Sequence, residues 1–420
     1  MEQLFAMITT IVMTLAMVCF SYQAVYVLVG LFKKPKKFVA KKMHKYAVVI
    51  SARNESAVIG NLIASVKTQT YDKDLVDVIV VADNCTDNTA QISRDAGAIV
   101  YERFNKQKVG KGYALQYLFQ NVDKEFGISH YDGYFVIDAD NILEEDYIEN
   151  MNHVFDHGYN VVTSYRNSKN FGANWISFGY ALWFLREAKF INNARMMLGV
   201  SCAVSGTGFL VSSKIIEKNK GWKHFLLTED IEFSVDNILN GETIGYAGDA
   251  ILYDEQPETM EASWHQRMRW SRGFYQVFYR YGKKLITRLV KERDFSCYDM
   301  LIMLIPGIGL TAIVAILGLL YFYFGMIGWK AAIINCVDSV GQYFISFYCT
   351  LLFLGAITLI SEHKRIRCRA WKCALYLFTF PIFMLTYIPI SVVALFHTPE
   401  WKPIIHSVSV TRKEIHETNY

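Results

Sequence analysis

The uneven distribution of charge is the feature that most limits the fold of this 420-residue chain. Charged residues lie mainly between about positions 33 and 294, and the long apolar stretches on either side carry almost none. Hydrophobic residues make up 52% of the chain and charged residues 20%, and the length is sufficient for one soluble domain and several membrane spans. The sequence therefore predicts a membrane protein with a soluble central domain.

The N-terminal segment predicts how this domain is oriented. Residues 4–32 form an uncharged run long enough to cross a bilayer, and we expect it to remain attached because it is too long for a signal-peptide core. A cluster of lysines follows, which the positive-inside rule places in the cytosol, where it contacts anionic lipid head groups. We therefore expect residues 1–45 to anchor a cytosolic domain in the plasma membrane. The lysines are Lys33, Lys34, Lys36, Lys37, Lys41, Lys42 and Lys45.

Three further apolar blocks, at about 300–326, 342–360 and 374–396, can each span a bilayer. The basic loop His363–Arg369 between the last two is expected in the cytosol. If each block crosses once, the tail 397–420 lies outside; it lies inside only if one block is re-entrant or interfacial. Prolines that offer places to break a helix are Pro306, Pro381 and Pro389.

The central part of the chain alternates between strand-like and helix-like segments. Short β-branched runs at 46–50, 76–81 and 133–137 predict buried parallel strands, and 56–68 and 88–96 carry helical spacing. This alternation is typical of an α/β fold with a mostly parallel sheet. We expect that domain to extend over residues 46–260.

Polar residues follow three of the predicted strands directly. Arg53 and Glu55 follow the first, Asp83 follows the second, and the pair Asp138 and Asp140 follows the third. Ligands of such sheets bind beyond the carboxyl ends of the strands, so the three loops predict one binding rim. Two aspartates separated by one residue can bind a shared Mg²⁺ or Mn²⁺ ion, although a solvated loop is the commoner context for a single D-x-D.

Two further motifs follow the D-x-D in a fixed order. Thr228-Glu229-Asp230 comes first, and Gln266-Arg267-Met268-Arg269-Trp270 comes next, just before the C-terminal apolar region. Together the three motifs resemble the membrane-bound inverting glycosyltransferases of family 2, which include the cellulose, hyaluronan and poly-N-acetylglucosamine synthases. The resemblance covers about residues 46–290. It implies a GT-A-like catalytic domain followed by interfacial helices over 261–297, transmembrane helices over 298–396 and a tail.

The resemblance assigns residues to the donor, a UDP-sugar. It implies that Asp138 contacts the nucleotide, that Asp140 with Asp138 holds the metal, and that Gln266 and Arg269 bind the diphosphate, for which an arginine fork is well shaped. Here Ala82 replaces the first aspartate of the usual D-D-x-S-x-D. Further nucleotide contacts are implied for Arg53, Glu55, Asp83 and Lys111. For Lys111 an ordinary loop lysine between two glycines is an equal alternative.

The resemblance also assigns the acceptor side. Asp230, with Glu229 beside it, is the expected catalytic base, and a direct displacement would invert the anomeric carbon. A helix cap is the alternative role for Thr228 or Asp230. Trp270 is expected to stack on the acceptor sugar, with an interfacial aromatic anchor as its alternative. The loop Ser205, Gly206 and Thr207 takes the place of the acceptor loop, although the usual C-G-S is replaced.

The expected reaction is transfer of a hexose or N-acetylhexosamine to a growing β-linked glycan, repeated and coupled to translocation. Single addition to a lipid or lipid-linked acceptor is one alternative, and a non-catalytic subunit for glycan binding or export is another. An accessory subunit is compatible with each. In the related synthases a tryptophan-bearing segment closes over the nucleotide, and Glu400 to Pro403 would serve if the tail is cytosolic.

Other classes of function are disfavoured by composition. A net charge of +4 does not indicate a nucleic-acid binder, whose basic residues would form a stripe on a soluble fold. The eight cysteines show no C-x-x-C and the ten histidines no H-x-x-E-H, so we expect reduced thiols and no zinc site. The aromatic stretch 174–198 contains four charged residues, which predict an amphipathic helix at the membrane or beside the acceptor path.

Overall fold

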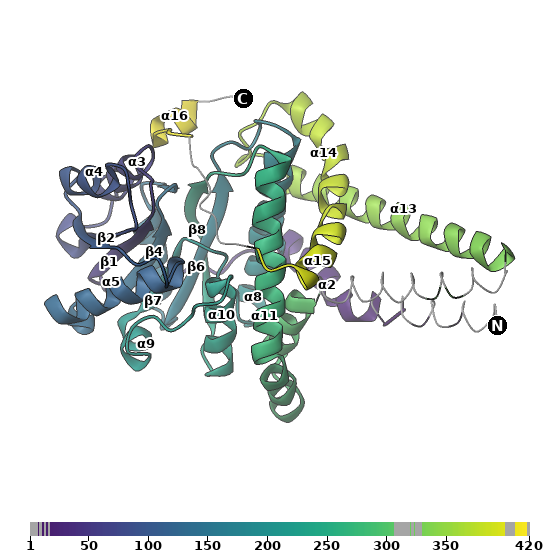
Figure 1. Cartoon of the computed structure of the whole chain (residues 1–420), viewed down its shortest axis with the longest axis horizontal. Helices are drawn as coiled ribbons and strands as arrows, with labels where there is room; N and C mark the ends of the chain where they lie inside the picture. The colour runs from purple at the N-terminus through teal and green to yellow at the C-terminus, as the bar shows by residue number, and fades with distance from the viewer. Residues whose placement is uncertain are drawn as a thin grey trace.

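The computed structural model describes residues 17–305, 330–399 and 408–417, together with positions 7, 11, 14, 15, 320 and 323. For 330–340 and 343 it describes the backbone alone. The expected span at 4–32 and the block at 300–326 fall partly outside these residues, and Glu400 to Pro403 fall wholly outside them. An α/β domain makes up the larger part of the molecule, and long helices extend from one side of it (Figure 1).

An eight-stranded sheet in the order β3-β2-β1-β4-β7-β6-β8-β5 forms the centre of the domain. The three strands predicted from the sequence are present as β1, β2 and β4, and β1 pairs in parallel with both others. Every residue of β1 except Ser51 is buried, because helices cover the sheet on both faces. The strands are β1 (Tyr46–Ala52), β2 (Val76–Asp83), β3 (Ile99–Arg103), β4 (Gly133–Asp138), β5 (Ile142–Leu143), β6 (Val161–Ser168), β7 (Phe209–Ser212) and β8 (Ile244–Asp254).

The sheet is mixed and mostly parallel, as four neighbouring pairs are parallel and three are antiparallel. Strand β7 runs antiparallel to both β4 and β6, whereas β6 and β8 are parallel. The β6–β8 register shifts after Ser164, so that Tyr165 pairs with Ile251 while Ser164 pairs with Ala247. The extra residues, Gly248, Asp249 and Ala250, lie on β8, and such an irregularity bends the strand that carries it.

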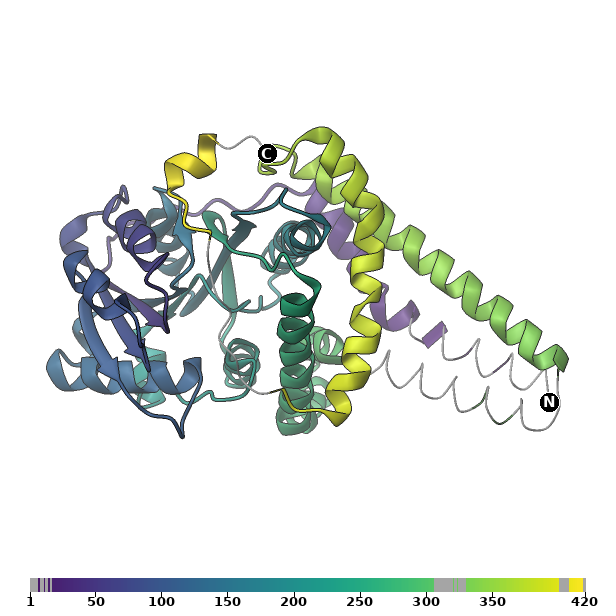
Figure 2. The same cartoon turned by 45° about the horizontal axis from the view of Figure 1, so that its top comes forward.

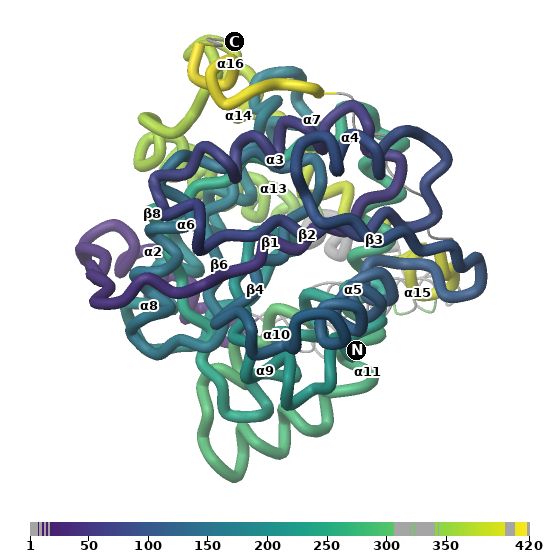
Figure 3. Tube along the Cα trace, turned by 90° about the vertical axis from the view of Figure 1, so that its left-hand side faces the viewer, coloured from purple at the N-terminus to yellow at the C-terminus, as the bar shows by residue number. Residues whose placement is uncertain are grey.

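Helices cover the two faces of the sheet, with α3 and α4 on one side and α5, α9 and α10 on the other (Figure 3). Helix α3 buries Ile59, Leu62, Ile63 and Val66, the i, i+3, i+4, i+7 spacing of an apolar helix face. These helices are α3 (Ile59–Lys67), α4 (Thr89–Asp95), α5 (Lys111–Glu125), α6 (Tyr147–Phe155), α9 (Ser213–Lys218) and α10 (Glu229–Leu239), with 3-10 turns at η1 (Lys73–Leu75) and η2 (Ile128–His130).

The aromatic stretch expected at the surface is a helical layer inside the protein. It consists of α7 (Trp175–Arg186), a π-helical segment η3 (Glu187–Asn192) and α8 (Asn193–Leu198). Asn174 opens α7 with a capping box, and ten of its twelve residues are buried. The predicted position at the membrane surface is therefore wrong for α7, which packs between β6 and the C-terminal helices. The alternative position beside the acceptor path stays a prediction.

The Q-x-x-R-W motif lies on the longest described helix, α11 (Met260–Glu292), beside α14 (Ala370–Leu385) and α15 (Tyr387–Phe396). Arg267 of the motif is fully buried; its guanidinium donates to the Phe383 carbonyl at 3.1 Å and to Thr386 Oγ1 at 2.6 Å. Thr386 lies where α14 gives way to α15. This arginine therefore joins α11 to that junction instead of entering the site.

Among the described residues, two helical segments are long and apolar enough to cross a membrane, Phe344–Ser361 and Ala370–Phe396. The first belongs to α13 (Lys330–Ser361), which extends away from the α/β domain together with α2 (Tyr22–Phe32), whereas α14 and α15 run across that direction beside α11 (Figure 1). Shorter apolar helices occur at Met17–Phe32 and Phe295–Ile305.

The tail segment 408–417 lies against the α/β domain (Figure 2). The Val408 amide donates to Glu255 at 3.0 Å, and Asn61 donates to Ser409 at 3.0 Å. Ile415, in the short helix α16 (Arg412–Glu417), is buried against Ile142 and Tyr253. The tail thus lies on the same side of the molecule as the predicted binding rim.

Candidate active site

The loops after β1, β2 and β4 meet at one edge of the sheet, as predicted from the parallel strands. Asn54 links the first two loops: its side-chain oxygen accepts the Thr86 amide at 2.8 Å. Asn54 and Asn84 adopt left-handed backbone conformations, with φ of 57° and 54°. Arg53 and Glu55 both lie on the first of these loops, and Glu55 donates its amide to Thr89 at 2.9 Å.

Asp83 ends β2 as a buried carboxylate paired with Arg103 of β3. Burial raises the pKa of Asp83, and the Arg103 guanidinium opposes that rise. Arg103 also donates to the Lys108 carbonyl at 2.7 Å, so it positions the loop that leads to α5. The carboxylate expected to contact the nucleoside is therefore held in one orientation by a buried cation.

Lys111 connects the D-x-D to the acceptor side. Its ammonium donates to Asp138 and, at 2.8 Å, to the Gly206 carbonyl, and it lies 4.0 Å from Glu229 Oε1. Burial lowers the pKa of Lys111, but Asp138 and Glu229 outweigh this and raise it above its ordinary value. An ordinary solvated loop lysine would not be 83% buried among these groups, its side chain being 17% exposed.

Asp140 is 5% exposed, and its two oxygens accept the Asn141 side-chain amide at 3.1 Å and the Glu255 backbone amide at 3.1 Å. Asp254 lies nearby at the end of β8; burial raises its pKa to about 6, Arg166 opposes this, and Asp140 adds to it. No three acidic, histidine or cysteine side chains are grouped to hold an ion among the described residues. The carboxylate oxygens fit a hard cation that takes its remaining ligands from phosphates and water.

Asp230 lies in the first turn of α10, where its Oδ2 accepts the Gly206 amide at 2.7 Å. Burial raises the pKa of Asp230, and the Gly206 amide and Lys111 oppose this. Burial also raises the pKa of Glu229 to about 7, Asp230 adding to the rise and Lys111 opposing it. Thr228 precedes the helix but makes no side-chain capping bond, so the capping alternative is wrong for Thr228.

Helix α11 approaches α10 closely beside this carboxylate pair. A Cβ at Gly273 would lie 2.5 Å from the Thr228 side chain, so only glycine allows this approach. Three buried polar atoms here, Thr228 Oγ1, Gln266 Oε1 and Arg269 Nε, have no hydrogen-bond partner within the described chain. Because buried polar groups are normally paired, these atoms are available to a polar ligand.

Trp270 packs edge-on against two aromatic rings of α7, Tyr180 at 5.8 Å and Phe184 at 6.3 Å between centroids. The ring is partly exposed, so it belongs to the wall between α7 and α11. Thr207 of the expected acceptor loop accepts the Asp138 amide at 2.9 Å and donates to Asn141 at 2.6 Å. The loop 205–207 therefore lies between the D-x-D and the carboxylate pair.

Sequence reasoning missed several charged residues at the rim. Asp254 follows a strand directly, so the rule that identified Asp83 and Asp138 would have found it once β8 was recognised. Arg166 and Lys169 lie on and after β6, a strand that was not predicted. Lys169 is 5% exposed and donates to the Val408 carbonyl at 3.4 Å, a contact that no local pattern signals.

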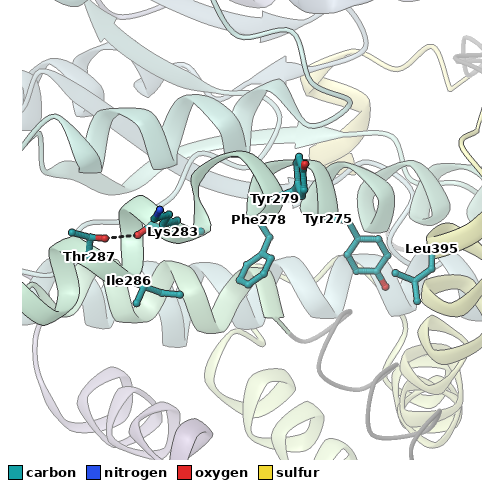
Figure 4. Close-up of a pocket in the computed structure, with 8 residues that line it drawn as sticks. Tyr275, Phe278, Tyr279, Lys283, Ile286, Thr287 and Leu395 are labelled. Carbon is teal, nitrogen blue, oxygen red and sulfur yellow. Dashed lines mark hydrogen bonds between the residues drawn. The ribbon is translucent and has the colours of Figure 1, made fainter.

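A separate apolar hollow of about 510 Å³ lies on α11 beyond the motif residues. Figure 4 shows Tyr275, Phe278 and Ile286 on its helical wall and Leu395 of α15 at one end. Tyr279 at its rim is 94% exposed. The hollow contains none of the predicted donor or acceptor residues.

Comparison with known proteins gives relatives in one class of enzyme. The chain is similar to a probable glycosyltransferase, YdaM, of Bacillus subtilis (28% identity over 56% of this chain and 56% of that protein). It is similar to the beta-monoglucosyldiacylglycerol synthase of Synechocystis, with 24% identity over 62% of this chain and 54% of that protein. It is also similar to the poly-beta-1,6-N-acetyl-D-glucosamine synthase of Staphylococcus aureus, with 25% identity over 60% of this chain and 59% of that protein. The chain thus spans 54 to 59% of the length of these relatives.

A solved structure shares the fold. The mannosyltransferase PcManGT of Pyrobaculum calidifontis, in complex with GDP-Man and Mn²⁺, matches with a TM-score of 0.58 at 15% identity, over 84% of this chain and 97% of that one. This likeness supports the GT-A-like architecture of the domain. Residues 44–273, more than half of the chain, match the family described as "Glycosyltransferase like family 2". The chain therefore belongs to glycosyltransferase family 2.

Proposed function

We propose that this protein is a membrane-bound inverting transferase that moves a hexose or N-acetylhexosamine from a UDP-sugar to a growing β-linked polysaccharide. The observation that carries the proposal is the position of Lys111, whose ammonium contacts Asp138, the Gly206 carbonyl and Glu229. One cation thereby joins the donor motif, the acceptor loop and the carboxylate pair. A single displacement requires the donor and the acceptor to be held close together, and these contacts bring their predicted binding groups together.

In the proposed mechanism Asp230 takes the proton of the acceptor hydroxyl. Its Oδ2 is held by the Gly206 amide, which leaves the carboxylate fixed in position for proton transfer. Burial disfavours the ionised form, which makes the carboxylate more basic. A divalent ion held by Asp140 and Asp138 would neutralise the diphosphate leaving group. Lys111 and Arg269 supply further positive charge on that side.

The donor and metal assignments have support outside this chain. The S. aureus relative is by name a synthase of poly-beta-1,6-N-acetyl-D-glucosamine, and PcManGT was solved with GDP-Man and Mn²⁺. The choice of a UDP-sugar rests on the resemblance to the polysaccharide synthases. The contacts described above do not identify the donor sugar, and they do not call for an accessory subunit.

Single addition to a lipid acceptor is the second candidate. The Synechocystis relative is by name a glycolipid synthase, and the apolar hollow on α11 offers space for acyl chains beside the membrane helices (Figure 4). A non-catalytic role in glycan binding or export remains the third candidate. The length of the product distinguishes the first two.

The test is release of UDP by the detergent-solubilised protein, given a panel of UDP-sugars with Mg²⁺ or Mn²⁺. We expect turnover with one donor, and a fall of about 10²- to 10⁴-fold in Asp230→Asn, the range for loss of a general base. Asp249→Asn, an 80% exposed carboxylate, is the control and should retain activity. Sizing the product separates polymer from single addition. Binding of UDP without turnover of any donor would favour the non-catalytic role.

A further inference from the structure

One peptide group of the acceptor loop lies between two charged side chains. The Ser205 carbonyl accepts a hydrogen bond from Arg166 Nη1 at 3.1 Å. On its other side, the Gly206 amide donates to Asp230 Oδ2 at 2.7 Å. The carbonyl of Ser205 and the amide of Gly206 belong to the same planar peptide unit and point in opposite directions.

The planarity of this unit couples the two hydrogen bonds. While Arg166 holds the Ser205 carbonyl, the amide must point to Asp230; a rotated peptide would direct the carbonyl oxygen at the carboxylate and the amide at the guanidinium. Gly206 has φ of +78°, and glycine tolerates a wide range of φ, so its own conformation does not oppose the rotation. Two donors hold the Ser205 carbonyl: the Thr207 amide of the same loop at 2.9 Å, and Arg166, which is the contact from outside the loop.

Arg166 is itself held firmly. Its Nε and Nη2 both contact Asp254 at the end of β8, and its guanidinium stacks on the Phe184 ring at 3.9 Å. The side chain is 18% exposed, so water screens these contacts weakly. Three elements, β6, β8 and α7, thus converge on one guanidinium, whose planar fork can serve a carboxylate and a carbonyl together.

We propose that Arg166 is a positioning residue that fixes the Ser205–Gly206 peptide and through it the orientation of the Asp230 carboxylate. The inference rests on the proposed role of Asp230 as the base. Lys111 holds the next carbonyl of the loop, that of Gly206, so both ends of Gly206 are fixed by cations. The pair Arg166 and Asp254 therefore transmits the position of strand β8 to the carboxylate.

The experiment compares Arg166→Met and Arg166→Lys with a matched control, Arg365→Met. Arg365 also stacks on a ring, that of the neighbouring Tyr165 at 4.2 Å, and also pairs with acidic side chains, but it contacts no residue of the site. Steady-state turnover, the KM for the donor, the pH profile and the melting temperature are measured for all four proteins. A cryo-EM structure of Arg166→Met then shows the orientation of the Ser205–Gly206 peptide.

We expect kcat of Arg166→Met to fall roughly 10- to 100-fold, with KM for the donor changed less than about threefold, because a misplaced base affects the chemical step. Arg166→Lys should recover part of kcat, since an ammonium can still donate to the Ser205 carbonyl. The hydrogen bond from the Gly206 amide lowers the pKa of Asp230. Loss of this bond should therefore raise that pKa and move the acid limb of the pH profile to higher pH. Of the other charges near this carboxylate, Glu229, Lys111 and Arg269 are unchanged in these variants, whereas the pKa of Glu187, which Arg166 lowers, should rise in Arg166→Met.

Arg365→Met should lower the melting temperature but leave kcat and the pH profile as in the wild type. If it lowers kcat as much as Arg166→Met does, loosening of β6 is the cause and the inference is wrong. An unchanged peptide with an intact Gly206–Asp230 hydrogen bond in the Arg166→Met structure would overturn it regardless of activity. Absence of turnover in the wild type, by contrast, would count against the proposed function alone.

Discussion

The two sides of the site differ in how completely their polar groups are paired. On the donor side, Asp83 has Arg103 and Asp138 has Lys111. On the acceptor side, the Thr228 hydroxyl is buried without a partner in the described chain, and burial raises the pKa of Glu229 to about 7. The donor side is therefore structured before any ligand binds, whereas the acceptor side carries an electrostatic cost that a bound ligand would relieve.

Removing Lys111, which joins the two sides, should have the largest effect on turnover. Lys111→Met leaves Asp138 and Glu229 without their shared cation, so we expect turnover to fall on the order of 10²- to 10³-fold, as for loss of an electrostatic contact to the reacting groups. Lys108→Met, on the exposed part of the same loop, is the matched control. Near-normal UDP release by Lys111→Met would show that the two sides work independently.

The closeness of α11 to α10 can be changed without altering charge. Gly273→Ala places a methyl group against Thr228, so we expect kcat to fall roughly 10- to 100-fold as α11 moves away from the carboxylates. Gly282→Ala on the same helix meets the Phe278 side chain at 3.4 Å and should be tolerated. Equal activity of the two variants would mean that the contact between the helices does not position the site.

The paired donor side should respond mainly in binding. Asp83→Asn removes a charged hydrogen-bond partner, so we expect UDP to bind about 10- to 100-fold more weakly in calorimetry, equivalent to about 1.5–3 kcal/mol. Asp77→Asn lies on the same strand, where its carboxylate accepts the Tyr131 hydroxyl at 2.9 Å, and should leave UDP affinity unchanged. A loss of affinity in both would point to distortion of β2.

The unpaired acceptor side should be destabilised at high pH. The pKa of Glu229 in the folded protein lies above its ordinary value, so ionisation opposes folding as pH rises from about 4.5 towards and beyond 7. We therefore expect Glu229→Gln to raise the melting temperature by a few degrees at pH 8 and by less at pH 5. A stabilisation that is the same at both pH values would show that ionisation of this carboxylate is not its source.

The two sides also differed in how far the sequence predicted them. Strands β1, β2 and β4 and their terminal polar residues were found because each is a compact run with its functional residues attached. The orientation of the Ser205–Gly206 peptide was not, because it depends on Arg166 and on Asp254, which lies 88 residues further along the chain. The burial of α7 and α8 was mispredicted for a similar reason: Arg186 of α7 and Arg195 of α8 have partners, Gln23 and Asp299, that are distant in sequence.

The attachment of the tail to the α/β domain has a consequence for membrane topology. The helix that contains Ile305 packs on this domain and Val408 contacts it, so residues 305 and 408 belong to one body. If that body stays in the cytosol, the segment between these residues must cross the bilayer an even number of times. Three single crossings are then excluded. In that case the junction at Thr386, held by Arg267, would let α14 and α15 lie flat, with one face on protein and the other in lipid. The bilayer would then serve as a floor that fixes the height at which an acceptor meets Asp230.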